Sequence, residues 1–260
     1  MNNPKPVFIA DTCIGGLPVL KSMWDSGHAS NAIFMADYEV NPLGVKSESA
    51  IADVVNKWLG LAKDHSDTLV IACNTLSIRY RQLPSSTIAS SGLKQIVTMV
   101  DCFEAMIRIE ADQLANRKIL IIGTAFTVSQ SLYPDMLGTA LPGTRVNTVA
   151  ATELERNIAR FLPYNSEGDS VFTSDLRQAI ENSDIVVLAC TCFPMAKAEL
   201  ESQFPGVVFI DPGAYCSGLL EEDNSGEERK LTVKVKGDVV SRARVCEFAK
   251  SWLGSGFTGL

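Results

Sequence analysis

Histidine is the scarcest chemically versatile residue in this chain, with only His28 and His65 among 260 residues. Neither follows an apolar run that could form a buried strand. A Ser-His-Asp or Cys-His hydrolase would therefore lack its general base. Beside Cys190-x-Cys192 there is no second Cys or His pair at metal spacing, so a zinc site lacks ligands. We expect no bound metal.

Motifs for nucleotides and for redox chemistry are missing as well. No G-x-G-x-x-G follows a predicted strand, and neither G-x-x-x-x-G-K-[ST] nor C-x-x-C occurs. The sequence therefore predicts chemistry that uses no cofactor.

The chain also lacks long apolar runs and an excess of positive charge. No run approaches the ~20 residues that span a bilayer, and "MNNPKPVFIAD" has no signal-peptide pattern. A net charge of -7 makes nucleic acid and anionic membranes poor partners. Seven scattered cysteines, an odd number, suit free thiols in a reducing compartment. We expect a cytoplasmic protein with a small-molecule partner.

Short apolar runs alternate with helical patterns along the chain. The runs are continuous, which is typical of strands covered on both faces. This alternation predicts an α/β fold with mainly parallel sheets flanked by helices. The predicted strands lie at 6–11, 31–37, 68–74, 94–101, 117–124, 144–150, 183–191 and 206–212. The predicted helices lie at 16–26, 47–64, 101–115, 127–137, 152–161, 172–181, 194–202 and 213–221.

Two further elements are predicted near the C-terminal end. "KLTVKVKGD" (230–238) alternates between apolar and polar residues and indicates an edge strand of a hairpin. A helix at 239–253 would end at Gly254, a suitable C-cap.

One pair of similar segments bears on the domain organisation. "VIACNT" (70–75) and "VLACTC" (187–192) are apolar runs that end in Ala-Cys. Two similar α/β halves would explain this similarity, and a chance resemblance between apolar strands explains it equally well. We expect one α/β domain from 1–98 plus 208–260 and a second from 99–207, with the active site in the cleft between them.

Polar residues gather where the predicted strands end. Ligands of open parallel sheets bind outside these carboxyl ends. The strand ends carry Asp11-Thr12, Asp37, Cys73-Asn74-Thr75, Gly123-Thr124, Cys190-Thr191-Cys192 and Asp211. Two thiols without histidine suit proton transfer at carbon, in which a thiolate removes a proton and a thiol returns one from the opposite face. Hydroxyl and amide donors at helix N-termini would hold carboxylates.

The same cysteines and threonines could also serve the fold rather than catalysis or substrate binding. Free cysteine often acts as a small core residue, the more plausible reading for Cys13, Cys102, Cys216 and Cys246. The strand-end threonines could equally be helix N-caps.

Six sequence blocks, in order along nearly the whole chain, resemble the aspartate/glutamate racemase superfamily and, within it, the glutamate racemases. They are "DTCIGGLPVL" (11–20), "PLGVKS" (42–47), "ACNTLS" (72–77), "GTAFTVSQS" (123–131), "ACTCFPM" (189–195) and "GDVVSRARVCEFAKSWLG" (237–254). The resemblance implies a cofactor-independent racemase of a small acidic amino acid, with glutamate expected. It further implies a supply of D-glutamate for peptidoglycan and a homodimer.

The resemblance also implies roles for individual residues. Cys73 and Cys190 would be the acid/base pair, and Asp11 and Glu153 would assist them. Glu155, two residues further along, is an alternative to Glu153. The implied substrate contacts are Asp11, Thr12, Leu43, Gly44, Asn74, Thr75, Thr124, Thr191 and Cys192.

The chain departs from the family pattern at several of these positions. Thr12 and Cys13 stand for Ser and Gly, Leu43 and Phe193 for Tyr, and Cys192 for His. Two alternatives therefore remain beside glutamate racemisation. One is another superfamily reaction, such as that of an aspartate or hydantoin racemase, a maleate isomerase or an arylmalonate decarboxylase. The other is a non-catalytic binding relative, which the two intact cysteine motifs disfavour.

Overall fold

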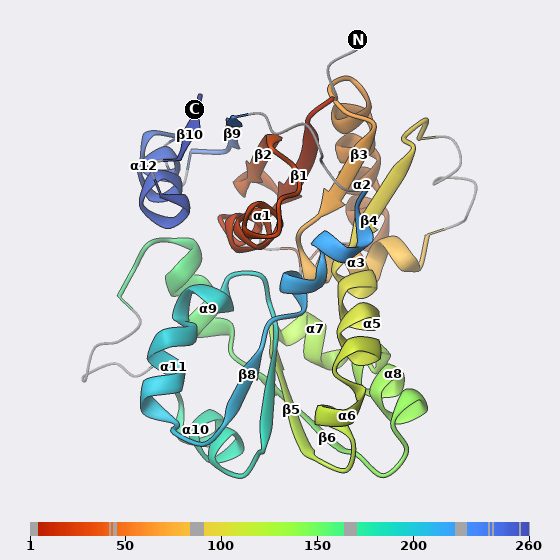
Figure 1. The fold of residues 1–260 in the computed structure, drawn as a ribbon, viewed down its shortest axis with the longest axis vertical. Coiled ribbons are helices and arrows are strands. Elements are labelled where there is room, and N and C mark those ends of the chain that lie inside the picture. Colours follow the sequence, from red (N-terminus) through yellow and green to blue (C-terminus); the bar gives the residue numbers. More distant parts are fainter. Residues whose placement is uncertain are drawn as a thin grey trace.

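The computed structural model describes residues 5–41, 43, 46–83, 91–163, 171–221, 228–238, 240, 242–254 and 256–259. These residues form two sheets flanked by helices (Figure 1). The first sheet has the strand order β10-β9-β2-β1-β3-β4, and the second has the order β6-β5-β7-β8. Every strand pairing described is parallel. The predicted α/β class is confirmed.

The first sheet has buried side chains on both faces of its central strand. Along β1, Ile9 belongs to a core cluster with α1, whereas Phe8 belongs to a separate cluster with α2. Successive side chains of a strand point to opposite faces, so a continuous apolar run serves two cores. The strands are β1 (Val7–Asp11), β2 (Asn31–Asp37), β3 (Thr68–Ile71), β4 (Gln95–Thr98), β9 (Arg229–Lys236) and β10 (Phe257–Thr258). The α-helices of this half are α1 (Gly16–Asp25), α2 (Glu48–Lys63), α3 (Asn74–Arg81) and α12 (Arg242–Leu253).

The second sheet repeats this construction. On β7, Val187 joins a cluster with α5 and α8, and Val186 and Leu188 join the cluster that contains α9, α10 and α11. The strands are β5 (Lys118–Gly123), β6 (Arg145–Ala150), β7 (Ile185–Ala189) and β8 (Val208–Ile210). The helices are α5 (Met99–Ile109), α6 (Ala111–Leu114), α7 (Ala125–Ser129), α8 (Leu132–Ala140), α9 (Thr152–Ala159), α10 (Ser174–Glu181) and α11 (Lys197–Gln203).

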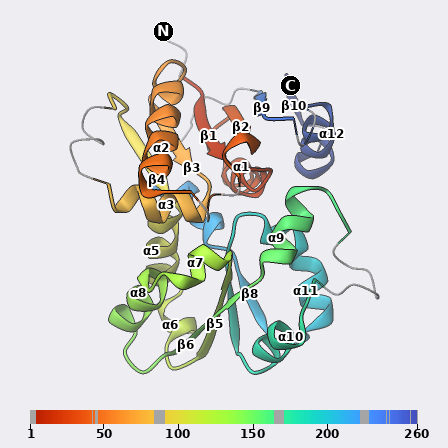
Figure 2. The same cartoon turned by 180° about the vertical axis from the view of Figure 1, so that it is seen from behind.

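The two halves meet at the carboxyl ends of their central strands. In Figure 2, α7 and α9 of the second half lie at the junction with the first half. Several hydrogen bonds cross this junction. In one the Tyr38 hydroxyl donates to the Ala159 carbonyl at 3.0 Å, and in another the Thr75 and Thr124 hydroxyls lie 3.4 Å apart. The junction therefore collects the strand ends that the sequence marks as polar.

Several sequence-based assignments differ from the structure. The expected edge hairpin at 230–238 is wrong, because β9 pairs in parallel with β2 and lies between β2 and β10. Its alternating pattern reflects one partly exposed face rather than an edge. The predicted helix at 213–221 is instead two 3-10 turns, η4 (Pro212–Tyr215) and η5 (Ser217–Leu219), because Gly213 and Gly218 disfavour an α-helix. Helix α3, directly after Cys73, was not predicted.

The sheet boundary also falls later than the expected domain boundary. We expected the first domain to resume at 208, but Val208–Ile210 form β8 and pair with β7 of the second sheet. The second sheet thus extends to Ile210, and the division into two domains itself stays a prediction. Within the described ranges, no helix combines the length and apolar character needed to cross a bilayer.

One buried polar contact anchors α2 to the first sheet. The Trp58 indole donates a hydrogen bond to Asp37 Oδ2 at 2.9 Å, and both residues are fully buried. The other oxygen, Asp37 Oδ1, has no hydrogen-bond partner among the described residues. The carboxyl group therefore depends strongly on this one indole.

Replacing Trp58 with Phe should lower the free energy of unfolding by about 1–3 kcal/mol beyond the loss from the smaller ring, because a buried acceptor loses its donor. Urea denaturation measures this loss. Trp252→Phe is the matched control: the Trp252 indole nitrogen has no partner among the described residues, so this variant should show only the loss from the smaller ring. Equal losses in both variants would contradict the argument.

Candidate active site

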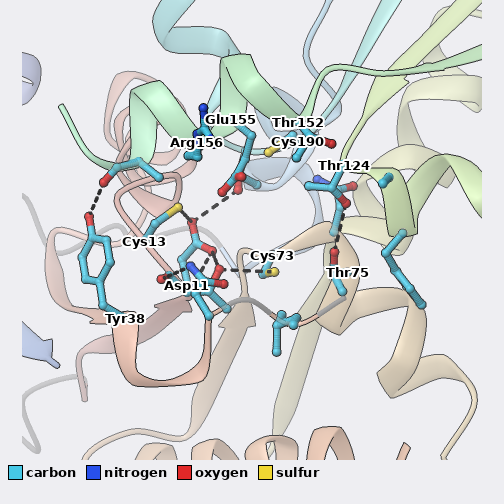
Figure 3. A pocket seen from close by; sticks show the side chains of 18 of the residues that line it. Asp11, Cys13, Tyr38, Cys73, Thr75, Thr124, Thr152, Glu155, Arg156 and Cys190 are labelled. Carbon is cyan, nitrogen blue, oxygen red and sulfur yellow. Dashed lines mark hydrogen bonds between the residues drawn. The ribbon is translucent and has the colours of Figure 1, made fainter. Parts of the chain in front are cut away.

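A cavity of about 420 Å³ lies where the strand ends of both halves meet. The first half contributes residues that follow β1, β2 and β3, and the second contributes residues that follow β5 and β7, together with one face of α9. Figure 3 shows these side chains around a common space. A cavity therefore lies between the two α/β halves, where the sequence analysis expected the active site.

Cys73 and Cys190 both line this cavity. Cys73 follows β3 and is the N-cap residue of α3, and Cys190 follows β7. Each is only 7% exposed. In Figure 3 the two side chains reach the pocket from opposite sides. Burial, followed by the nearby charge of Asp11, raises the pKa of Cys73 well above its usual value. The arrangement offers two separate thiols to one bound molecule.

Asp11 lines the same cavity and is 1% exposed. Its Oδ1 accepts a hydrogen bond from the Thr12 backbone N–H at 2.6 Å, and its Oδ2 accepts one from the Thr191 hydroxyl at 3.3 Å. Burial raises the pKa of Asp11 to about 7, although these hydrogen bonds oppose the shift. The Thr12 hydroxyl lies 3.5 Å from Asp11 Oδ1 and 3.9 Å from Cys73 Sγ. One buried carboxyl group thus joins the turns of both halves.

Most of the expected substrate contacts line the cavity. Asp11, Thr12, Leu43, Asn74, Thr75, Thr124 and Thr191 all do so, and Gly44 lies outside the described residues. The alternative explanation as helix N-caps holds only for Thr124, whose hydroxyl accepts from the Thr127 N–H at 3.2 Å. Asn74 is held in place because its Oδ1 accepts from the Tyr133 hydroxyl at 2.6 Å.

Two expected site residues do not line the cavity. Glu153 is exposed and pairs with Arg156, whereas Glu155 is partly buried and lines the cavity. Residues two apart on a helix point in very different directions, so only one of them can face the site. Burial raises the pKa of Glu155. Cys192 is fully buried behind the cavity, so the structure offers it no substrate contact.

Other lining residues escaped sequence reasoning. Tyr38 and Asn41 follow β2, Arg156 lies on α9, and Arg160 is the C-cap residue of α9. Asn41 donates to the Thr12 carbonyl at 2.9 Å, which holds the first turn. Cys13 also lines the cavity, although we considered it a core residue. The only signal for the arginines was their closeness in sequence to the two glutamates.

The remaining strand-end carboxylates serve the fold. Asp37 binds the Trp58 indole, and Asp211 accepts from the Gly213 N–H at 2.8 Å. In the part of the chain that the structure describes, no three His, Cys, Asp or Glu side chains are grouped as metal ligands would be.

Comparisons with known proteins extend over nearly the whole chain. No protein-family model matches it. A glutamate racemase from Campylobacter jejuni is 27% identical over 262 residues, which cover 95% of this chain and 97% of that protein. A glutamate racemase from Vibrio parahaemolyticus is 26% identical over 249 residues, covering 88% and 86%.

Solved structures share the fold. The Campylobacter jejuni glutamate racemase structure has a TM-score of 0.76 at 24% identity, covering 95% of this chain and 98% of that one. A Francisella tularensis glutamate racemase in complex with D-glutamate has a TM-score of 0.72 at 17% identity, covering 98% and 95%. A Picrophilus torridus aspartate racemase has a TM-score of 0.54 at 17% identity, covering 84% and 92%.

The chain thus resembles the aspartate/glutamate racemase superfamily in its sequence and its two-sheet fold. Within that superfamily it is similar to the glutamate racemases, as the sequence blocks indicated, and this resemblance is confirmed.

Gly15 lets the turn after β1 approach the turn after β7 closely. A Cβ atom at this position would lie 2.6 Å from Asp11 Oδ2, 2.5 Å from Thr191 Oγ1 and 2.9 Å from the Cys192 backbone nitrogen. Gly15→Ala should therefore displace the Asp11 hydrogen bonds and lower the thermal stability, by about 1–3 kcal/mol. Calorimetry tests this. Gly60→Ala is the control: it lies in α2 with nothing near its Cβ position and should stabilise by about 0.5–1 kcal/mol.

The raised pKa of Asp11 has a consequence for stability. Between about pH 4 and pH 7 the folded protein keeps this proton while the unfolded chain releases it, so stability should fall as the pH rises through this window. Asp11→Asn should flatten that slope in urea denaturation series. Asp67→Asn is the control, because Lys5 and Lys94 hold the pKa of exposed Asp67 below its usual value and outside the window. An unchanged slope in Asp11→Asn would refute the assignment.

Proposed function

We propose that this chain is an amino-acid racemase, an isomerase, that interconverts L- and D-glutamate by proton exchange at Cα. The observation that carries the proposal is the presence of Cys73 and Cys190 on opposite sides of one buried cavity. Full-length similarity to glutamate racemases supports it.

The chemistry follows from the two sulfur atoms. One cysteine, as thiolate, removes the Cα proton from one face of the substrate, and the other, as thiol, delivers a proton to the opposite face. The raised pKa of Cys73 favours its thiol form. We therefore assign Cys73 as the proton donor and Cys190 as the base in the resting enzyme. After a turnover in this direction the two roles are exchanged.

Substrate binding is assigned to donors around the cysteines. The N-terminus of α3 begins at Asn74, and its backbone N–H groups with the Thr75 and Thr124 hydroxyls suit the α-carboxylate. Arg156 and Arg160 bring positive charge to the same cavity and suit the side-chain carboxylate. Leu43 adds an apolar wall where the family pattern has tyrosine.

The setting of this activity is proposed from the resemblance. A glutamate racemase supplies D-glutamate for peptidoglycan, works in the cytoplasm and needs no cofactor. A homodimer belongs to the same proposal.

Replacing either cysteine should abolish racemisation. We expect Cys73→Ala and Cys190→Ala each to lower kcat for glutamate by about a thousandfold or more, because each removes an acid/base group. Chiral chromatography measures the rate, and in deuterated water the wild-type product should carry deuterium at Cα. Cys246→Ala, at a partly exposed cysteine outside the cavity, should retain full activity. Full activity in both site variants would reject the mechanism.

A substrate panel separates the remaining functions. Glutamate, aspartate and a hydantoin are offered to the same preparation. Turnover of aspartate or hydantoin without glutamate would replace the proposed substrate, and ligand-induced stabilisation without isotope exchange would indicate a binding protein.

A further inference from the structure

The C-terminal end of α9 lies against the first half of the molecule. The Ala159 carbonyl near this end accepts a hydrogen bond from the Tyr38 hydroxyl at 3.0 Å (Figure 3). Both residues also line the cavity. Tyr38 is only 5% exposed, so little water competes for this hydrogen bond. The bond therefore joins the two halves within the wall of the cavity itself.

A second group of contacts holds Phe161, two residues further along. The guanidinium group of Arg244, on α12, donates to the Phe161 carbonyl at 3.1 Å and lies 4.9 Å from the centre of the Phe161 ring. The Phe248 ring, one turn further along α12, meets the Phe161 ring edge-on, with 5.2 Å between their centres. Because α12 belongs to the first half, these contacts also cross the junction.

The backbone of Phe161 has a conformation that glycine favours. Its φ is +57°, in the left-handed region. The Phe161 N–H donates to the Ile158 carbonyl and the Leu162 N–H donates to the Asn157 carbonyl, which is the Schellman pattern at a helix end. Glycine is the usual residue at the left-handed position of this pattern. A phenylalanine there is strained, and its contacts with α12 offset that strain.

These contacts lie away from a chain connection between the halves. Strand β4 ends at Thr98 and α5 begins at Met99, so the first half runs directly into the second at this point. In Figures 1 and 2 this connection lies on one side of the molecule, and α9 and α12 lie on the other. Contacts on the side opposite a connection are the ones that separate when two halves move apart about it.

Helix α9 and its C-cap supply one wall of the cavity. The residues of this wall are Thr152, Glu155, Arg156, Ala159 and Arg160. Neither cysteine of the proposed mechanism belongs to it, because Cys73 follows β3 and Cys190 follows β7. A displacement of α9 would therefore change the contacts with a bound molecule and leave the two cysteines in place.

We propose that Tyr38, Phe161 and Arg244 are positioning residues: they clamp the C-terminal end of α9 to the first half and so hold the α9 wall of the cavity against the substrate. This inference rests on the proposed function for the identity of the substrate, whereas the clamp is a property of the free protein. Phe161 and Arg244 do not line the cavity, so they act on it through α9.

The first measurement needs no substrate. The reduced protein is treated with iodoacetamide at one fixed pH, and the alkylation rates of Cys73 and Cys190 are read from their peptides by mass spectrometry. Tyr38→Phe removes one hydroxyl group, and Arg244→Met removes the guanidinium group but keeps an apolar stem. Each variant should raise both rates about three- to tenfold, the factor that corresponds to one lost hydrogen bond across the junction.

The second measurement separates KM from kcat. In both variants KM for glutamate should rise about three- to tenfold because the α9 wall is loosened. In contrast, kcat should stay within about twofold because the cysteines keep their positions.

Phe161→Gly distinguishes the clamp from a purely local role in ending the helix. Glycine is the residue that this backbone conformation prefers. A local role therefore predicts unchanged alkylation rates and unchanged KM in this variant. The clamp predicts that both increase, as in Tyr38→Phe.

Arg229→Met is the matched control. Like Arg244, Arg229 donates to a main-chain carbonyl, that of Trp24, and its guanidinium group lies 5.4 Å from the centre of the Trp24 ring. Both residues belong to the first half, so these contacts do not cross the junction. The variant should leave the alkylation rates and KM unchanged.

Several results would overturn the proposal. One is an unchanged pair of alkylation rates in Tyr38→Phe, which remains decisive if Phe161→Gly does not fold. Another is an equal increase in Arg229→Met, and a third is a fall in kcat at constant KM. If the wild-type protein racemises no glutamate, the proposed function fails, and the alkylation rates still decide whether the clamp exists.

Discussion

The structure depends on one buried carboxyl group placed where two sheets meet. Asp11 ends the central strand of the first sheet, yet one of its oxygens accepts a hydrogen bond from Thr191 of the second half. Burying the charged form of this group costs free energy, and for that reason its pKa is raised. The hydrogen bonds from Thr12 and Thr191 offset part of it. A polar group of this kind orients the two halves relative to each other, because only one arrangement satisfies it.

Because the turn after β1 and the turn after β7 approach each other closely, the two halves share one site. Gly15 has no side chain where a Cβ atom would overlap Asp11 and Thr191. Cys73 and Cys190 then reach one cavity from separate sheets. Acid/base chemistry on opposite faces of a carbon needs this separation, and no single βαβ unit provides it. Cys13, which lines the cavity, and Cys192, which is buried behind it, likewise come from the two halves, and their sulfurs are 3.1 Å apart.

Several features were predictable from local sequence because they depend on local physics. Continuous apolar runs are buried on both faces, so β1, β2 and β7 were found close to their bounds. Strand ends in a parallel sheet lie on one edge, which located Cys73, Thr75, Thr124 and Cys190. Other features depend on partners remote in sequence. The pairing of β9 with β2, and the contact of Cys13 with Cys192 across 179 positions, leave no local pattern.

The sequence by itself determined the α/β class, the polar strand ends and the two cysteine motifs, because periodicity and residue chemistry are properties of short segments. Only the tertiary structure decided which glutamate faces the site, that Cys192 lies behind it, and that Cys13 joins it. The phase of α9 relative to the cavity selects Glu155 over Glu153. That phase is set by packing of the whole helix against its neighbours, and a pattern of two nearby glutamates carries no information about it.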